Sequence, residues 1–360
     1  MPDFTVNAPV KPNAQPAPAI SVIVLNYNGA PWLERCLGSL RAQTIFDQLE
    51  VIVADNNSPD GSATLAAELM RDWPNGRVIQ HEANLGYCEG NNRAAAHARG
   101  RYLFFLNNDT WLEPDCLEVL LSTAGRMNAQ AGTPLMLNYD EDTVQSAGGA
   151  GFDLFGFMSL ERPHDSPKEV FVAGGCSYLV LRDWFERLGG FDAVFYMYAD
   201  EYDLSWRIWL AGGRIVSAPA ARLHHRGAAN ETSRGHGQKL IQQTSDDKRF
   251  LSNRNTLLTI LKNSQHVLLV LAGLQVLALA LEAFLTLLLV RRWSFLRRAY
   301  FEALRDCWRL RAHVRAARTS IRRLRRRSDW QMLRFLRWRL NRWDELRRFA
   351  RYGLPKVNQT

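Results

Sequence analysis

Amide and carboxylate side chains gather at the end of a short apolar run in the first third of the chain. Residues 102–106 are five apolar or aromatic residues, and Asn107, Asn108 and Asp109 follow at once. A run of this length and composition predicts a buried strand. Ligands of open α/β sheets bind outside the carboxyl ends of strands, so the triplet is placed to meet a ligand. Its hard oxygen atoms suit Mg²⁺ or Mn²⁺ shared with a diphosphate, although a simple turn would use the same residues.

Two more apolar runs end in polar side chains. Residues 21–25 are followed by Asn26 and Asn28, and residues 51–54 are followed by Asp55. A carboxylate at a strand end can accept hydrogen bonds from a nucleobase or from ribose hydroxyls. The alternative for Asp55 is a turn or a helix cap.

A glycine-bearing segment, residues 84–92, opens a predicted helix over residues 92–99. Gly86 and Gly90 permit close approach of the backbone to a ligand, and a helix N-terminus favours phosphate charge. Asn84 and Asn91 flank these glycines. The segment therefore predicts contacts with a phosphate-bearing ligand.

Three carboxylates lie within one helical turn in the second half of the chain. Asp200, Glu201 and Asp203 belong to the stretch Asp-Glu-Tyr-Asp-Leu-Ser-Trp-Arg. Clustered carboxylates raise one another's pKa, which helps one of them to act as a base near neutral pH. The alternative is an acidic helix start that the helix dipole favours.

Two adjacent histidines follow a strand predicted over residues 214–217. His224 and His225 precede Arg226 and Gly227. A neutral imidazole can ligate Mg²⁺ or Mn²⁺, or it can bond to a diphosphate oxygen. Arg226 could neutralise the same anion.

Alternating strands and helices must bring these groups together. A helix over residues 30–42 is predicted from apolar residues at helical spacing, between strands over residues 20–25 and 49–54. This order implies a right-handed parallel crossover and an α/β fold. Further helices are predicted over 63–73, 114–127 and 250–262, and further strands over 77–80, 170–173 and 177–181.

The motifs in this order resemble those of the family 2 glycosyltransferases, the inverting GT-A type, and within them the rhamnosyltransferase-like branch of polysaccharide and O-antigen assembly. The resemblance covers residues 19–263. The motifs are Val-Ile-Val-Leu-Asn-Tyr-Asn, Val-Ala-Asp-Asn-Asn-Ser-Pro-Asp-Gly-Ser, Asn-Leu-Gly-Tyr-Cys-Glu-Gly-Asn-Asn, Leu-Asn-Asn-Asp-Thr, and Gly-Gly-Phe-Asp followed by Asp-Glu-Tyr-Asp-Leu-Ser-Trp-Arg.

The resemblance implies a Rossmann-like α/β/α sandwich with a mostly parallel sheet, and a role for each polar residue. Glu201 or its neighbour Asp200 would be the catalytic base, because the family often has Asp where Glu201 stands. Asp109 and His224 would hold Mg²⁺ or Mn²⁺; His224 fits better than His225 because Gly227 follows it by three residues. The nucleotide-sugar-binding residues would be Asn26, Asn28, Asp55, Asn84, Gly86, Asn91, Asn107 and Asn108. Acceptor or other contacts would come from Gly175, Asp203, Arg207, His225 and Arg226.

The composition separates the last part of the chain from the rest. The chain has 360 residues and a formal net charge of +9, but residues 291–360 carry 22 Lys and Arg against 5 Asp and Glu. The five cysteines are scattered, which suits reduced thiols and argues against a zinc site. Three segments are predicted: a flexible leader over 1–19, the GT-A domain over 20–263, and over 264–360 a hydrophobic helix with an Arg- and Trp-rich helical tail.

The tail predicts membrane association. Residues 267–290 are mostly apolar and long enough to span a bilayer, but Glu282 opposes a span. A single span would also separate the cytosolic sugar nucleotide from the Arg-rich segment, which belongs inside. Helices in the membrane interface, or a re-entrant hairpin around Gly273, are therefore favoured over a span. Arginine with Trp and Leu suits an anionic membrane surface, and no other segment is typical of nucleic-acid binding.

The sequence thus predicts an inverting, metal-dependent glycosyltransferase at the cytoplasmic face of the inner membrane. It would move a sugar such as rhamnose from a nucleotide sugar to a lipid-linked or oligosaccharide acceptor in cell-surface polysaccharide synthesis. Two alternatives remain at this point: a nucleotidyltransferase that makes a sugar nucleotide, and a non-catalytic membrane scaffold with a degenerate domain. The donor, the linkage and the oligomeric state are not predicted.

Overall fold

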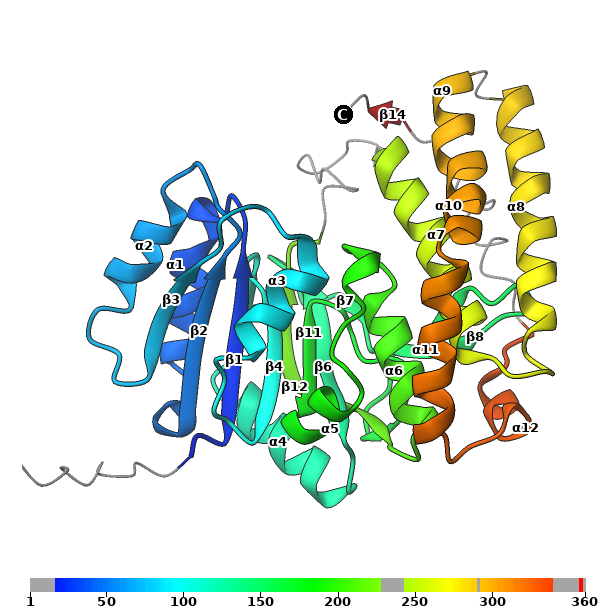
Figure 1. Cartoon of the computed structure of the whole chain (residues 1–360). Coiled ribbons are helices and arrows are strands. Elements are labelled where there is room, and N and C mark those ends of the chain that lie inside the picture. Colours follow the sequence, from blue (N-terminus) through cyan, green and yellow to red (C-terminus); the bar gives the residue numbers. More distant parts are fainter. Residues whose placement is uncertain (1–16, 228–242, 290–291, 339–355, 359–360) are drawn as a thin grey trace, which may run out of the picture.

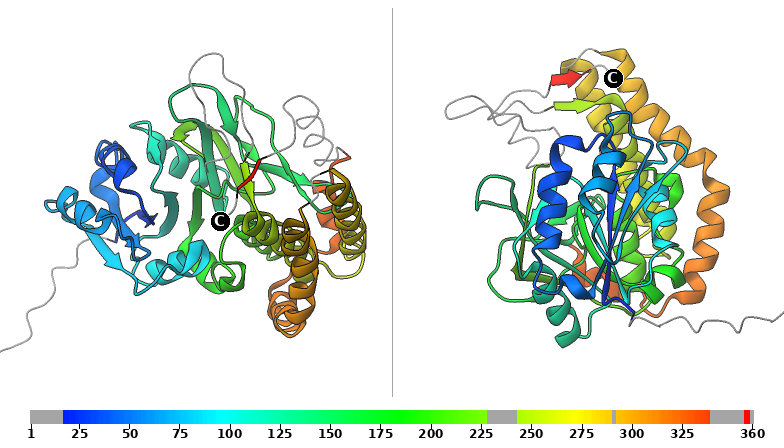
Figure 2. Two further views of the ribbon diagram at one scale, coloured as in Figure 1. Left: turned by 90° about the horizontal axis from the view of Figure 1, so that it is seen from above. Right: turned by 90° about the vertical axis from the view of Figure 1, so that its left-hand side faces the viewer.

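The fold is a large mixed sheet with helices on both faces and a group of helices at one side (Figures 1 and 2). The computed structural model describes residues 17–227, 243–289, 292–338 and 356–358. The predicted leader up to residue 16 and the tail residues 339–355 lie outside the described residues.

The first half of the described chain alternates strands and helices. Its elements are β1 (Ile20–Asn26), α1 (Ala30–Arg41), β2 (Leu49–Asp55), α2 (Ser62–Leu69), β3 (Gly76–Gln80), α3 (Gly86–Ala95), β4 (Tyr102–Asn107), β5 (Thr110–Leu112), α4 (Cys116–Arg126) and β6 (Ala131–Asn138). The second half contains shorter strands and then mainly helices. These are β7 (Val144–Ser146), β8 (Gly149–Phe152), β9 (Met158–Leu160), β10 (Lys168–Glu169), β11 (Ser177–Leu181), α5 (Arg182–Arg187), α6 (Asp200–Leu210), β12 (Ile215–His225), β13 (Gln243–Ser245), α7 (Asp246–Asn263), α8 (Val270–Leu289), α9 (Trp293–Leu296), α10 (Ala303–Arg309), α11 (Arg311–Leu324), α12 (Asp329–Met332) and β14 (Lys356–Asn358).

The central sheet has ten strands, with the order β10-β12-β6-β11-β4-β1-β2-β3 and with β5 and β7 added to β12 and β6. β1 pairs in parallel with β2 and with β4, as the crossover rule predicts. β11 runs antiparallel to β4 and β6. The polar ends of β1, β2 and β4 therefore meet at one edge of the sheet.

The alternation of side chains along β1 divides the core into two layers. Val22 and Val24 point to the layer that α1, α2 and α4 cover, whereas Ile23 points to the layer that α3, α5 and α6 cover. Both layers are apolar because parallel strands are buried on both faces. The α/β/α sandwich predicted from sequence is confirmed.

The helices after α7 are packed onto one side of the sandwich. α7 contacts α6, α8, α10 and α11, and the core layer of α6 continues into Leu257, Leu258 and Ile260 of α7. Phe335, beyond α12, packs its ring 4.7 Å from that of Trp209 in α6. The C-terminal helices therefore cover one side of the α/β core.

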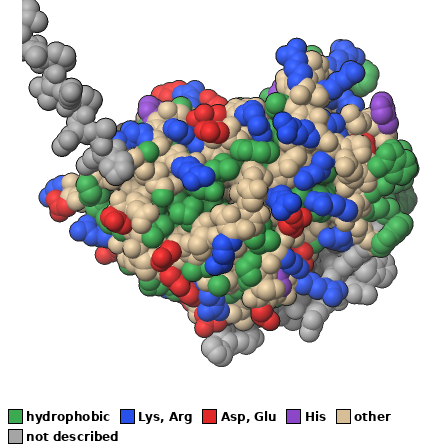
Figure 3. All heavy atoms as spheres, turned by 90° about the horizontal axis from the view of Figure 1, so that it is seen from below, with side chains coloured by type: hydrophobic (Ala, Val, Ile, Leu, Met, Phe, Trp, Pro, Cys, Tyr) green, Lys and Arg blue, Asp and Glu red, His purple; other side chains and the backbone are tan. Residues whose placement is uncertain are grey.

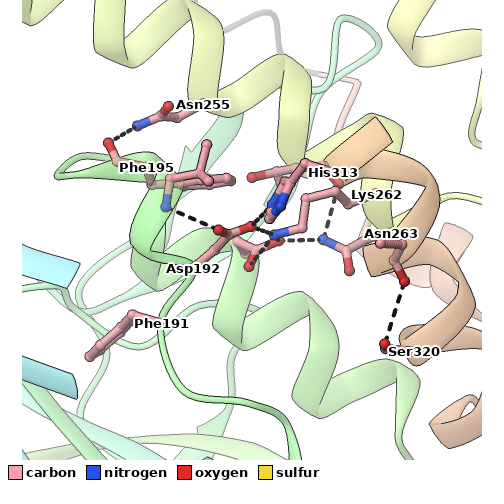
Figure 4. A network of polar contacts seen from close by, with 12 residues as sticks. Phe191, Asp192, Phe195, Asn255, Lys262, Asn263, His313 and Ser320 are labelled. Atoms are coloured by element: carbon pink, nitrogen blue, oxygen red, sulfur yellow. Dashed lines mark hydrogen bonds and ion pairs between the residues drawn. The ribbon is translucent and has the colours of Figure 1, made fainter. Parts of the chain in front are cut away.

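A buried ionic network joins α7 to α6 and to the loop before it (Figure 4). Lys262 Nζ lies 3.0 Å from Asp203 Oδ1 and also contacts Asp192. Arg207 Nη2 lies 2.8 Å from Asp203 Oδ2, and His313 Nε2 lies 2.8 Å from Asp192 Oδ2. Burial opposes ionisation of Asp203, but Arg207 and Lys262 outweigh it and lower its pKa.

Three predicted elements differ in the structure. β10 ends at Glu169, and residues 170–173 form no strand apart from a single bridge at Val172, because the segment leaves the sheet edge after two residues. α3 begins at Gly86 rather than at residue 92, since Gly86 takes φ +75° and turns the chain into the helix early. Gly273 lies inside α8, so no hairpin forms there.

α8 is long and apolar enough to cross a membrane by length and composition. The segment Val270–Leu288 has a mean hydropathy of 2.0, and 22% of it is buried inside the protein. The buried side includes Gln275 and Leu279.

Replacing Lys262 by Met should strongly destabilise the fold. The change leaves Asp192 and Asp203 buried without their shared cation, and breaking a buried ion pair costs about 3 kcal/mol or more. Urea unfolding followed by circular dichroism measures the change. Arg93→Met is the control, because its pairs with Glu82 and Glu89 lie at the surface and contribute little; equal losses in the two variants would contradict the role of Lys262.

Candidate active site

The polar ends of β1, β2 and β4 form one hydrogen-bonded row. Asn26 Nδ2 donates to Asp55 Oδ1 at 2.6 Å, and Asn108 Nδ2 donates to Asn26 Oδ1 at 2.8 Å. Asp55 is fully buried and also accepts bonds from the backbone N–H and the hydroxyl of Ser58. Asn107 is half-buried at the end of β4, where its N–H donates to the carbonyl of Cys176. The three strand ends are therefore fixed by their own side chains, and Asp55 already has three donors.

Gly29 sits against this row. A Cβ at Gly29 would lie 2.0 Å from Asn26 Oδ1 and 2.2 Å from Asn108 Nδ2, so no other residue fits there. The preceding Asn28 is exposed, has φ +54° and donates its N–H to Ser58 Oγ at 3.1 Å. Asn28 thus lies at the rim, open to a ligand, while Asn26 lies beneath.

The start of α3 is held by amide side chains. Asn84 Oδ1 accepts from the N–H of Gly86 at 3.0 Å, and Asn56 Nδ2 donates to the carbonyl of Gly86 at 3.0 Å. A Cβ at Gly86 would lie 2.4 Å from the ring of Tyr196, in the loop before α6. Asn91 is buried, and its Oδ1 has no hydrogen-bond partner. These contacts bring α3 and the loop before α6 together.

The structure brings His225, and not His224, to Asp109. His225 Nε2 lies 3.4 Å from Asp109 Oδ1. His224 points to the opposite face of β12, where it stacks on Trp111 with ring centroids 3.7 Å apart. Its Nδ1 lies 3.1 Å from the carbonyl oxygen of Asn138. The predicted pair Asp109 and His224 is therefore not formed, because neighbouring residues of a strand face opposite sides and spacing alone does not tell which side faces the site.

Asp109 and His225 offer one carboxylate oxygen and one imidazole nitrogen, which suit Mg²⁺ or Mn²⁺. Among the described residues no group of three or more His, Cys, Asp or Glu side chains could hold a metal ion. A cation at this pair would thus need further oxygen ligands from a bound molecule or water. Burial lowers the pKa of His225, but Cys176 and Asp109 outweigh it and raise the pKa to about 10. With this raised pKa, the imidazole of His225 carries a proton, which a bound cation would displace.

The acidic cluster at the start of α6 separates into two kinds of carboxyl group. Burial, followed by the charge of Glu201, raises the pKa of Asp200 well above its usual value. Burial also raises the pKa of Glu201. A Cβ added at Gly175 would lie 3.3 Å from the Glu201 carboxyl carbon, so Glu201 lies against the backbone of Gly175. Asp203, in contrast, is the ion-paired group described above and has a structural role.

Gly175 and Cys176 connect the acidic pair with the Asp109–His225 pair. Gly175 lies against Glu201, and the next residue, Cys176, interacts with His225. The hydroxyl of Tyr87 in α3 fixes this segment by donating to the carbonyl of Gly175 at 2.6 Å. The carboxyl group of Glu201, with its raised pKa, and the Asp109–His225 pair therefore lie along one short segment.

The backbone before α6 is strained. Tyr196, Tyr198 and Ala199 all have φ between +58° and +69°, a region that non-glycine residues rarely adopt. Asn255 Nδ2 in α7 lies 2.8–2.9 Å from the carbonyl oxygens of Phe195, Met197 and Tyr198. Asn255 thus positions the acidic start of α6. Asn255 was not among the site residues predicted from sequence, and its full burial is visible only in the structure.

The two predicted arginines differ in accessibility. Arg207 is buried against Asp203 and donates to the carbonyl of Leu188 at 2.8 Å, so it is not available to an acceptor. Arg226 is exposed, and its guanidinium lies 3.8 Å from the ring centroid of Trp32. The backbone N–H of Arg226 donates to the carbonyl of Asp109 at 3.1 Å. Arg226 therefore borders the Asp109–His225 pair.

Comparison with known proteins shows which family the chain belongs to. Residues 21–189 match the family described as Glycosyl transferase family 2. An N-acetylglucosaminyl-diphospho-decaprenol L-rhamnosyltransferase of Mycobacterium tuberculosis (strain ATCC 25618 / H37Rv) is 30% identical over 267 residues, which cover 66% of this chain and 85% of the relative. The chain belongs to glycosyl transferase family 2. The glycosyltransferase is also 33% identical over 234 residues to the O-antigen biosynthesis protein RfbC of Myxococcus xanthus, covering 59% of this chain and 18% of that protein.

Solved structures confirm the GT-A fold of this glycosyltransferase. GalNAc-T7 with UDP, GalNAc and Mn²⁺ superposes with a TM-score of 0.57 at 16% identity, over 71% of this chain and 49% of that one. The mannosyltransferase PcManGT from Pyrobaculum calidifontis, in complex with GDP-Man and Mn²⁺, gives a TM-score of 0.50 at 18% identity, over 81% and 87% of the chains. At these identities the likeness concerns the fold.

Glu201→Gln should raise the stability of the glycosyltransferase at neutral and alkaline pH. Because the folded-state pKa of Glu201 is raised, its ionisation weakens the fold above that pKa and costs nothing at a pH below its unfolded value. The melting temperature of the variant should exceed that of the wild type at pH 8, and the difference should vanish as the pH falls below about 4.3. A melting temperature below that of the wild type at pH 8 would show that the fold stabilises the Glu201 carboxylate, which contradicts a raised pKa.

Proposed function

We propose that the glycosyltransferase transfers a sugar, with inversion, from a nucleotide sugar to a glycan acceptor carried by a lipid diphosphate, in the synthesis of a cell-surface polysaccharide. The observation that supports this most is the joining of Glu201 to the Asp109–His225 pair through Gly175 and Cys176. Inverting transfer needs a base for the acceptor hydroxyl on one side of the anomeric carbon and positive charge for the departing diphosphate on the other.

Glu201 is the proposed base. Its raised pKa favours uptake of the acceptor proton as that oxygen attacks the anomeric carbon and the bond to the nucleoside diphosphate breaks. Burial and the charge of Glu201 raise the pKa of the neighbouring Asp200. Asn255 acts as a positioning residue because it holds the turn from which α6 starts.

Asp109 and His225 are the proposed ligands of Mg²⁺ or Mn²⁺, in place of Asp109 and His224. The bound cation would neutralise charge on the diphosphate leaving group. Arg226 at the rim adds a further positive charge. Asn28, Asn84, Gly86 and Asn107 remain candidates for direct contact with the nucleotide sugar, while Asn26, Asp55 and Asn108 form the row beneath and Asn91 is buried in α3.

The donor and the acceptor are proposed from the relatives. The mycobacterial protein is named for transfer of L-rhamnose to N-acetylglucosaminyl-diphospho-decaprenol, and the chain covers 85% of it. A rhamnose nucleotide and a polyprenyl-diphosphate-linked sugar are therefore the first pair to test. The family match favours this over a nucleotidyltransferase.

A panel of sugar nucleotides tests the proposal. dTDP-rhamnose, UDP-glucose, UDP-N-acetylglucosamine and GDP-mannose are each added to the purified protein with and without Mn²⁺. One nucleotide sugar should raise the melting temperature only with Mn²⁺, since a ligand at 100 times its Kd adds about 2.7 kcal/mol. The same donor should give transfer to a polyprenyl-diphosphate-N-acetylglucosamine acceptor. In Glu201→Gln the kcat of this transfer should fall by a factor of about 100 or more.

Paired histidine variants supply the control. His225→Ala should abolish the Mn²⁺-dependent shift, whereas His224→Ala should keep it if the protein stays folded. If no sugar nucleotide stabilises folded wild-type protein, the scaffold alternative replaces the proposal. If His224→Ala alone removes the metal effect, the assignment of His225 is wrong.

We further propose that α8 rests on a membrane at the cytoplasmic face, where nucleotide sugars are found. Its exposed side chains are apolar along the helix: Val270, Val276, Leu277, Leu281, Phe284, Leu285, Leu287 and Leu288. The face carries no exposed charged residue among those described. Hydrophobic side chains gather at this side of the molecule, with Lys and Arg beside them (Figure 3). An apolar helix face flanked by basic residues is typical of helices that lie in an anionic membrane interface.

Leu277→Asp with Leu281→Asp should weaken membrane binding. Both leucines are more than 60% exposed, so the change should leave the fold intact. Flotation with phosphatidylglycerol vesicles should recover far less of this variant than of the wild type. Leu160→Asp is the control, because Leu160 is 57% exposed and belongs to β9 rather than to α8; flotation unchanged by the α8 double substitution would contradict the docking face.

A further inference from the structure

A basic pocket lies between α11 and the turn that joins α7 to α8. Its volume is about 490 Å³, within the range of small-molecule sites. Five of its ten lining residues are Lys or Arg, and none is Asp or Glu: the cations are Lys262, Arg315, Arg318, Arg322 and Arg325. The pocket is separate from Asp109, His225 and Glu201, none of which lines it.

Three of the five cations have structural partners. Lys262 is held by Asp192 and Asp203 in the buried network. Arg318 Nη1 donates to the carbonyls of Leu261 and Ser264 at the end of α7, at 2.5 and 2.6 Å. Arg325 binds the carbonyl of Asn263 and lies 3.3 Å from Asp329. Arg318 and Arg325 thus close the C-terminal end of α7, where basic groups are favoured.

The other two cations have no such explanation. Arg315 and Arg322 are exposed, and neither takes part in an ion pair among the described residues. They lie seven residues apart on α11, on the same helical face as Arg318 between them. Like charges at this spacing repel one another, so a bound anion would stabilise this face of α11.

A buried hydroxyl adds an independent sign of a ligand. Ser264 lines the pocket, is 1% exposed, and its Oγ has no hydrogen-bond partner. A buried polar group without a partner costs free energy. An anion in the pocket would form charge-assisted bonds with Arg315 and Arg322, and rotation of the Ser264 side chain about χ1 would bring its hydroxyl within reach of the same anion.

We propose that this pocket binds a phosphate or diphosphate group, at a second anion site apart from the active site. Guanidinium groups bind phosphate oxygens through two parallel hydrogen bonds, which makes arginine the fitting residue. The pocket wall formed by Ser264, Gln265 and His266 leads directly into α8, whose first residue is Val270. A phosphate carried by a lipid and a soluble phosphate compound share this chemistry, and the experiment separates them.

The test compares two double variants of the full chain that lose the same charge. Arg315→Gln with Arg322→Gln alters the pocket, whereas Arg309→Gln with Arg323→Gln alters exposed residues of α10 and α11 that do not line it. Binding of inorganic pyrophosphate is measured by calorimetry in EDTA, which removes the divalent ion that the active site would use. We expect at least tenfold weaker binding in the pocket variant and less than a twofold change in the control.

Vesicles then identify the source of the phosphate. If flotation on phosphatidylglycerol, relative to phosphatidylcholine, falls in the pocket variant but not in the control, the ligand is a lipid phosphate. If flotation is the same in both variants while pyrophosphate binding is lost only in the pocket variant, the ligand is a soluble phosphate compound. The proposal is overturned if wild-type protein binds no pyrophosphate in EDTA, or if both double variants weaken it equally.

Discussion

The contact of Lys262 with Asp192 and Asp203 is the constraint on which the site depends. One ammonium group from α7 joins the loop before α6 to the first turn of α6, and that turn carries Asp200 and Glu201. Desolvation makes such a network costly unless every charge is paired, and Arg207, His313 and Asn263 complete the pairing. Asp200 and Glu201, the proposed acidic pair, lie in the same turn and form no ion pair among the described residues, so one turn of α6 carries both structural charge and the proposed reactive charge.

The energetic costs of the site are concentrated within a few residues. Two carboxyl groups with raised pKa follow three non-glycine residues of positive φ. Such strain persists only where the surroundings determine the conformation. Asn255 supplies that determination with three carbonyl contacts, and the apolar packing of α7 against α6 holds Asn255 in place. Stability provided by the C-terminal helices thus maintains a strained turn with buried carboxyl groups, the turn to which the catalytic base is assigned by proposal.

The sequence predicted the parts of the site that local pattern controls. The apolar runs of β1, β2 and β4 and the polar residues at their ends were predicted correctly, because strand period and parallel order place them at one edge. The choice between His224 and His225 depended on which face of β12 looks toward Asp109, which a bulge in that strand helps to set. Arg207 was expected near the acceptor but is buried, and Asn255 acts across 57 residues of chain on Tyr198. Both facts depend on tertiary packing, which cannot be inferred from the spacing of residues or from composition.

The packing of the last helices against α6 has a consequence for the order of events during synthesis. Arg327 donates to the carbonyls of Trp209 and Gly213 at the end of α6, and Phe335 covers Trp209. These partners leave the ribosome more than a hundred residues after α6, and domains fold as the chain emerges from its N-terminus. Strands β1, β2 and β4 can therefore form early, while α6 lacks these partners until the arginine-rich segment has been made. With the roles proposed for α6 and α8, the enzyme becomes competent only after the segment proposed to bind a membrane exists, so nascent chains do not consume donor before they can reach one.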